Sequence, residues 1–159
     1  METLQPGNIL RIPDFDFENG SNLRDKYLIV IEVSTTQSLF LQVLTTSQVK
    51  VPWEKMIHGC RNEVENGLHY FMFEQSRCIG KLSGVDFAFP KNTFVLFRNN
   101  IKDVSIIPFI SKYRYTAAWV CTLLPEEFLR LKKCIKQNAR MADRSAKRNF
   151  PEIFLADRF

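Results

Sequence analysis

Polar side chains gather where an apolar run ends, near the first third of the chain. The stretch LFLQVLTTSQVKVP, residues 39–52, begins like a buried strand and then passes into Thr45, Thr46, Ser47 and Gln48. Hydroxyl and amide groups of this kind either complete a turn by bonding to loose backbone groups or contact a phosphate. The four residues taken alone leave both interpretations open.

Two basic residues, Arg24 and Lys26, stand just before the preceding apolar run, 27–33. A guanidinium offers forked donors to two phosphate oxygens, whereas an ammonium is a point charge. Basic residues also often flank a buried strand and are simply exposed to solvent. The runs 27–33 and 38–44 are separated by a short polar turn, which predicts an antiparallel hairpin. Because such a hairpin sets the start of one strand across from the end of the next, we expect Thr46 to share a phosphate-sized space with these cations.

Other chemistry is less well supported. His58 has no recognisable carboxylate partner, so it reads as structural or exposed and not as a general base. No glycine-rich loop carries the Lys-Ser/Thr pair of a nucleotide-hydrolysing P-loop. The four cysteines are widely spaced and include no C-x-x-C pair, which argues against zinc and favours reduced, mostly buried thiols of a cytosolic protein. We therefore expect no metal and no cofactor.

The elements that would position these residues are mainly strands. The chain has 159 residues, of which 45% are hydrophobic and 14 are Phe, enough for one domain with a real core. Short apolar runs bounded by Gly, Pro or Asn predict an antiparallel barrel or sandwich. The expected strands are 8–13, 27–33, 38–45, 68–74, 93–97 and 104–110, with 49–67 left as an irregular crossing. Aromatic residues in these regions either stack on bases or fill the core: Trp53, Tyr70, Phe71 and Phe73.

A single main helix is predicted from Pro125, which is followed by two acidic residues suited to a helix start. Its apolar face has helical spacing and should pack on the sheet: Leu124, Phe128, Leu131 and Ile135. The opposite face is basic and is either merely solvated or a surface for RNA or an acidic partner: Arg130, Lys132, Lys133 and Lys136. We expect one domain over 1–139, followed by a basic tail, 140–159, that is flexible or docks.

The net charge is +5, which favours anionic partners without requiring them. The N-terminal residues lack a basic segment followed by a long apolar run, and no stretch approaches the roughly 20 apolar residues of a membrane span. The sequence therefore predicts a soluble, cytoplasmic protein without a membrane partner.

The N-terminal third of the chain has several short segments in a recognisable order. QPGNILRIP is followed by a loop rich in Gly, Ser and Asn, then by LRDKYLIVIEVS and LFLQVLTTSQVKVP. This order resembles the MazF/PemK (Kid) family of toxin endoribonucleases. That family has a P-G-D-I opening, a loop, a basic residue heading an apolar strand, and a strand ending in Thr-Ser. The resemblance covers about the first 52 residues. Asn8 replaces the usual acidic residue, Lys26-Tyr27 replaces Arg-Pro, and residues 53–92 look like an insertion.

The resemblance implies an SH3-like barrel with a C-terminal helix that forms a homodimer and cleaves single-stranded RNA without a metal. Its attacking group is the substrate's own 2′-hydroxyl, and its cellular partner is an acidic antitoxin. The matching catalytic positions are Arg24, Lys26 and Thr46, and the matching substrate-binding positions are Asn22, Thr45, Ser47 and Gln48. The large supply of Phe also leaves apolar surface for a dimer interface.

Two alternatives stay open. The first is a non-catalytic SH3-like barrel that binds protein or nucleic acid through its basic face; the loss of Arg-Pro favours it, whereas Thr46-Ser47 favours the enzyme. The second is a toxin of this barrel type that poisons a protein target instead of cutting RNA.

Overall fold

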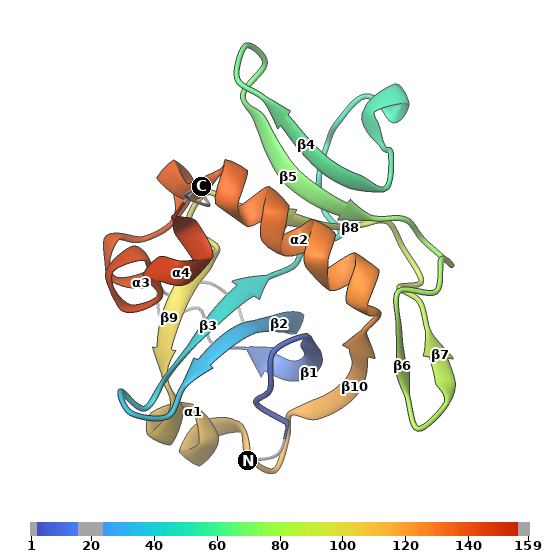
Figure 1. The fold of residues 1–159 in the computed structure, drawn as a ribbon. Helices are drawn as coiled ribbons and strands as arrows, with labels where there is room; N and C mark the ends of the chain where they lie inside the picture. The colour runs from blue at the N-terminus through green and yellow to red at the C-terminus, as the bar shows by residue number, and fades with distance from the viewer. Residues whose placement is uncertain (1–2, 16–23, 156–159) are drawn as a thin grey trace.

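The computed structural model describes residues 3–15 and 24–155, and it is mainly β structure with antiparallel strand pairing. The larger sheet has the order β7-β6-β10-β1-β2-β3-β9, and the smaller sheet has the order β4-β5-β8 (Figure 1). The strands are β1 (Asn8–Phe15), β2 (Arg24–Ser34), β3 (Leu39–Leu44), β4 (Gly59–Glu63), β5 (Leu68–Phe73), β6 (Gly80–Leu82), β7 (Val85–Phe87), β8 (Thr93–Leu96), β9 (Ile101–Ser105) and β10 (Ala118–Leu123).

The predicted mainly β architecture with a C-terminal helix is confirmed, although several helices follow the last strand, and the described strands do not close into the predicted barrel. The larger sheet ends at β7 on one side and at β9 on the other. The two sheets are joined at an isolated bridge between Thr46 and Phe94, whose backbone N–H and C=O groups bond reciprocally at 2.9 and 2.8 Å. The polar residues after β3 therefore lie where one sheet passes into the other.

The main helix is α2 (Pro125–Gln137), which begins at the predicted proline. It lies beside both sheets (Figure 1), and its predicted apolar face buries Leu131 and Ile135 in the largest core cluster. Tyr70, Phe71 and Phe73 of β5 are also buried, so these aromatic residues serve the core, whereas Trp53 is 84% exposed.

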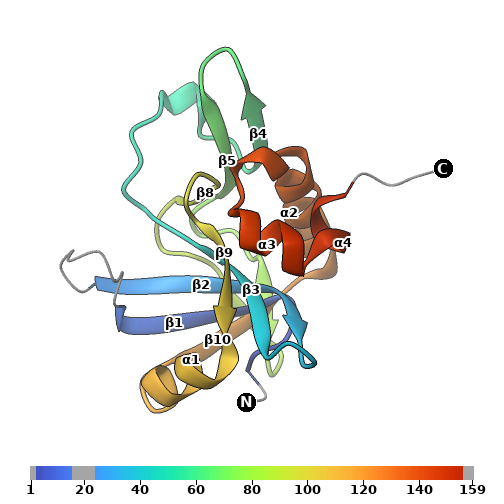
Figure 2. The same ribbon diagram turned by 90° about the vertical axis from the view of Figure 1, so that its left-hand side faces the viewer.

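Of the predicted tail at 140–159, residues 140–155 are described, and they pack on the protein. They form the short helices η2 (Ala139–Met141), α3 (Arg144–Asn149) and α4 (Pro151–Phe154). Ala146, Phe150 and Phe154 are buried in the same core as α2. These helices cover one face of the larger sheet and α1 (Ile106–Tyr113) covers the other (Figure 2). No helix within the described ranges is long and apolar enough to cross a membrane.

The predicted strand at 104–110 is wrong, because β9 ends at Ser105 and the chain continues as α1. Phe109 and Tyr113, four residues apart, are buried on one side of this helix, while Ile107 is exposed. Packing of this aromatic face against the sheet outweighs the β preference of the local sequence. Pro108 is tolerated because first-turn N–H groups have no intrahelical partner.

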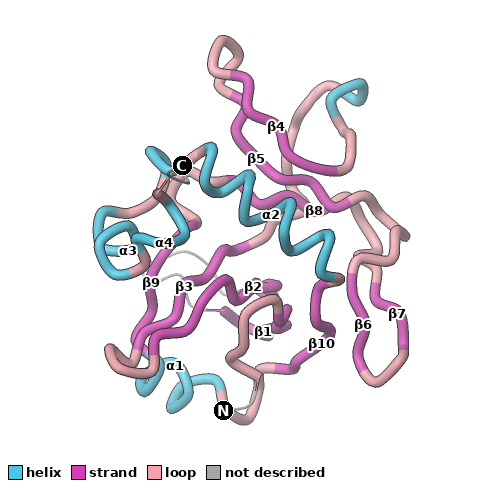
Figure 3. The backbone as a smooth tube through the Cα atoms, in the orientation of Figure 1, coloured by secondary structure: helices cyan, strands magenta, loops and turns pink. Residues whose placement is uncertain are grey.

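The crossing from β3 to β4 contains one 3-10 turn, η1 (Trp53–Lys55), within loop backbone (Figure 3). At its end β4 is fastened to α2 by a disulfide between Cys60 and Cys134. The expectation of four reduced cysteines is therefore wrong; only Cys78 and Cys121 carry free thiols. The two bridged residues are 74 positions apart, and cysteine spacing gives no sign that a strand and a helix bring them together.

Candidate functional site

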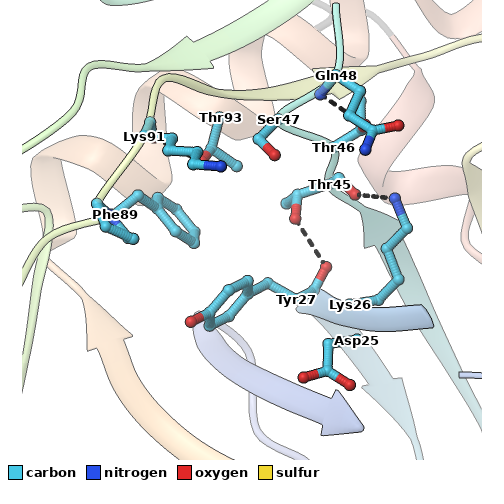
Figure 4. A pocket seen from close by; sticks show the side chains of 11 residues that line it. Asp25, Lys26, Tyr27, Thr45, Thr46, Ser47, Gln48, Phe89, Lys91 and Thr93 are labelled. Atoms are coloured by element: carbon cyan, nitrogen blue, oxygen red, sulfur yellow. Dashed lines mark hydrogen bonds between the residues drawn. The ribbon is translucent and has the colours of Figure 1, made fainter. Parts of the chain in front are cut away.

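A pocket of about 160 Å³ lies at the point where β2 begins and the chain leaves β3. Three segments supply its walls: Asp25–Tyr27 from β2, Thr45–Gln48 after β3, and a facing segment with Phe89, Pro90, Lys91 and Thr93 (Figure 4). Five of the seven residues predicted from the sequence line this one space: Lys26, Thr45, Thr46, Ser47 and Gln48.

The register of the β2–β3 hairpin brings these residues together. Leu28 pairs with Leu44, so the residues before Leu28 lie across from those after Leu44. Both the backbone N–H and the hydroxyl of Thr45 donate to the Tyr27 carbonyl oxygen, at 3.1 and 3.0 Å. This double contact extends the pairing of β2 and β3 beyond Leu44, and it uses the buried Thr45 hydroxyl for a backbone hydrogen bond.

Lys26 lies within the pocket wall, and its ammonium donates to the Thr45 carbonyl oxygen at 3.0 Å (Figure 4). The bond holds the cation at the strand junction.

The Thr46 hydroxyl accepts the Gln48 backbone N–H at 3.2 Å, which is the turn-forming contact that the residue types allow. An accepting hydroxyl still has its own hydrogen to donate to an oxygen in the pocket. Ser47 and Gln48 are exposed at the rim. The groups of the TTSQ stretch thus stabilise the turn and also border a pocket, and their contact with a phosphate stays a prediction.

Two predicted residues fall outside this description. Asn22 lies outside the described residues. Arg24 opens β2, and its backbone pairs with Phe15 of β1, but its side chain also lies outside them. The assignment of Arg24 as a phosphate contact therefore stays a prediction.

The pocket is cationic because Lys91 adds a second ammonium, which points in Figure 4 toward the space bordered by Ser47 and Thr45. Asp25 is the acidic residue among the lining side chains. Its carboxylate accepts from Arg11 at 2.8 Å and from the Asp14 backbone N–H, and these bonds lower the pKa of Asp25.

Lys91 was not predicted from the sequence, because it stands in an irregular segment with no motif around it.

His58 has the carboxylate partner that the sequence did not reveal. Its Nε2 lies 2.8 Å from Glu127, and the two side chains are only 4% and 7% exposed. The Glu74 backbone N–H donates to His58 Nδ1 at 3.0 Å. This ring nitrogen is thus an acceptor, so Nε2 carries the hydrogen and donates to Glu127. The pair links α2, which carries Glu127, to the residue before β4, and it does not line the pocket. Its burial supports the structural interpretation of His58.

No known protein-family model matches the chain, and no curated protein matches it. Among the described residues, no group of three or more His, Cys, Asp or Glu side chains could hold a metal ion. The geometry of the pocket is therefore the basis on which a function is proposed.

Proposed function

We propose that this protein is a metal-independent endoribonuclease that cleaves single-stranded RNA at the pocket between the β2 start and the β3 exit. The observation that carries the proposal is the convergence of two lysines and the Thr45–Gln48 groups on one small space. Cations and hydroxyl donors around a space of this kind are what an RNA phosphate requires.

The reaction needs no protein nucleophile. The substrate's 2′-oxygen attacks the adjacent phosphorus and loses its proton, the bond from phosphorus to the 5′-oxygen breaks, and the departing oxygen gains a proton. The products are a 2′,3′-cyclic phosphate and a 5′-hydroxyl. The protein holds the strand and stabilises the negative charge that develops on the phosphate oxygens.

Each pocket group has a role in this scheme. Lys26 and Lys91 would face the phosphate oxygens, and the Thr46 hydroxyl would donate to one of them. Ser47 and Gln48, exposed at the rim, would contact the neighbouring nucleotide. Arg24 keeps its sequence-based role as a second phosphate contact, and Asn22 keeps its role as a substrate contact.

The wider biological setting forms part of the same proposal. By its resemblance to the MazF/PemK family, the chain would be an SH3-like homodimeric toxin that acts in the cytoplasm and is neutralised by an acidic antitoxin. The described hairpins and the Thr46–Phe94 bridge between the sheets are compatible with a partly open arrangement of that kind. A dimer mass by light scattering at micromolar concentration supports the homodimer, and a monomer mass contradicts it.

The test is cleavage of a mixed-sequence single-stranded RNA by the purified full chain in the presence of a chelator. We expect cleavage with cyclic phosphate ends. Thr46→Ala should lower the rate by about 10²-fold or more, because a lost donor to a developing oxyanion costs about 3 kcal/mol of barrier. Thr36→Ala, in the exposed β2–β3 turn, is the matched control and should cleave like the wild type. Absence of cleavage by the wild type contradicts the proposal, as does full activity of Thr46→Ala.

A second candidate is a non-catalytic module that binds nucleic acid or protein through the basic face of α2. The observation in its favour is that the Thr45 hydroxyl, the Thr46 hydroxyl and the Lys26 ammonium all bond to local backbone groups. Arg130 and Lys133 are exposed on α2. This candidate predicts RNA binding without cleavage, weakened by Arg130→Gln with Lys133→Gln and unaffected by Thr46→Ala.

A further inference from the structure

A second, larger cavity of about 580 Å³ lies between α1 and the ends of β3 and β9. It is separate from the cationic pocket, with which it shares no lining residue. Its volume falls in the range of roughly 300–1,000 Å³ that is usual for small-molecule sites. Its size alone identifies no ligand, so the chemistry of its walls decides the class.

The wall contributed by β3 contains a buried amide, Gln42, in an otherwise apolar strand. Gln42 is 4% exposed, and its Oε1 has no hydrogen-bond partner among the described residues. Phe40 and Leu44, two positions away on either side, are core residues. A buried acceptor without a donor is costly, whereas an apolar side chain of the same shape would cost nothing there. Gln42 therefore offers the cavity an acceptor that the described fold does not use.

A cation stands beside this acceptor. Lys102 of β9 is the direct antiparallel partner of Gln42, so the two side chains project from the same face of the sheet. Lys102 is exposed and lines the cavity. Asp103 also lines the cavity. Its two carboxylate oxygens accept hydrogen bonds from the Ser145 hydroxyl and the Asn149 amide of α3, at 2.6 and 2.7 Å.

The helix side of the cavity is aromatic. Phe109 and Tyr113 of α1 line it, with ring centroids 5.1 Å apart, and Lys112 between them in sequence adds a further cation. The cavity thus combines apolar ring edges, a buried acceptor and ammonium groups near its mouth.

We propose that this cavity binds a nucleotide, with the base inside and the phosphate beside Lys102. The Watson–Crick edge of a base carries N–H donors, which Gln42 Oε1 can accept, and the base itself packs against aromatic carbon. A simple anion would leave the Gln42 acceptor unused, and an uncharged amine would leave the lysines unused. The nucleotide is either a free mononucleotide or one unit of an RNA strand, and binding in either form does not require cleavage at the other pocket.

The test is calorimetric titration of the full chain with AMP and with purine riboside 5′-monophosphate, which lacks the exocyclic amine of AMP. The wild type should bind AMP about tenfold more tightly, the effect of one hydrogen bond to a buried acceptor. Gln42→Met removes the acceptor and keeps the side-chain length, so it should abolish this preference. Gln75→Met, at an exposed glutamine outside the cavity, is the matched control and should retain it.

A third titrant distinguishes the two sources of the nucleotide. A short 2′-O-methyl oligoadenylate has no free 2′-hydroxyl and cannot be cut, so its binding is measured independently of catalysis. Binding of the oligomer but not of AMP, with the same dependence on Gln42, assigns the site to an RNA strand. If neither AMP nor the oligomer binds, the proposal is overturned, and it is also overturned if Gln42→Met keeps the preference of the wild type. The free energy of unfolding of Gln42→Met, measured in urea, should be at least as large as that of the wild type, because the buried acceptor without a donor has been removed.

Discussion

His58 donates a hydrogen bond to Glu127 across 69 residues of sequence, and both side chains are almost fully buried. The imidazole packs edge-on against Phe71 and Phe73 of β5, with ring centroids 5.9 and 6.0 Å apart. Glu127 and Cys134 are seven positions apart on α2, which places them on the same face of the helix. The hydrogen bond thus attaches α2 to the residue before β4, and the disulfide attaches α2 to β4 itself.

Removing one partner of this pair should destabilise the fold strongly. His58→Leu leaves the Glu127 carboxylate buried without its donor, which costs about 3–5 kcal/mol, whereas a double His58→Leu, Glu127→Leu variant should lose less than His58→Leu alone. Urea unfolding of the wild type, the two single variants and the double variant measures the coupling. Strictly additive losses would contradict the role assigned to the pair.

Glu63 should make stability depend on pH in the acid range. Its carboxylate accepts from Lys55, Arg61 and Asn66, in that order of effect, and these bonds lower the pKa of Glu63 from 4.5 to about 2. A lowered folded-state pKa adds stability above the unfolded value, and this contribution is lost as pH falls from about 4.5 toward about 2. Glu63→Gln should flatten the pH dependence in that window, as measured by the urea midpoint; an unchanged slope would exclude this carboxylate as its source.

The cysteines should react unequally with an alkylating reagent. Burial and the neighbouring Cys78 raise the pKa of Cys121 to about 12, so its thiol should stay unmodified in the native protein while the half-buried Cys78 reacts. Mass spectrometry should find two modified thiols after unfolding without reductant and four after reduction. Four modified thiols without reductant would mean that the Cys60–Cys134 bridge is absent from the purified protein.

Under the proposed endoribonuclease function, the two pocket lysines should differ in their effects. Lys26→Met removes the cation held at the strand junction and should lower kcat/KM by about 10²–10³-fold. Lys91→Met should raise KM more than it lowers kcat, because it removes a contact from the facing segment. Lys81→Met, at an exposed lysine in β6, is the control and should leave single-turnover RNA cleavage unchanged. Equal losses in all three variants would indicate a general effect of charge.

The sequence by itself determined the elements that local chemistry specifies. The β2–β3 hairpin follows from two apolar runs joined by a short polar turn, and α2 follows from Pro125 and helical apolar spacing. Because the pairing within a hairpin is local, the meeting of Lys26 with the TTSQ residues could also be predicted.

Only the tertiary structure decided the contacts between residues distant in the chain. The packing of α2 beside β4 brings Cys60 to Cys134 and His58 to Glu127. The packing of the segment just before β8 brings Lys91 to the pocket. The helix at 106–113 likewise replaced an expected strand because packing of its aromatic face outweighed a weak β preference. Such contacts form when two elements bury their apolar surfaces against each other. The residue spacing within one element does not specify which other element it will pack against.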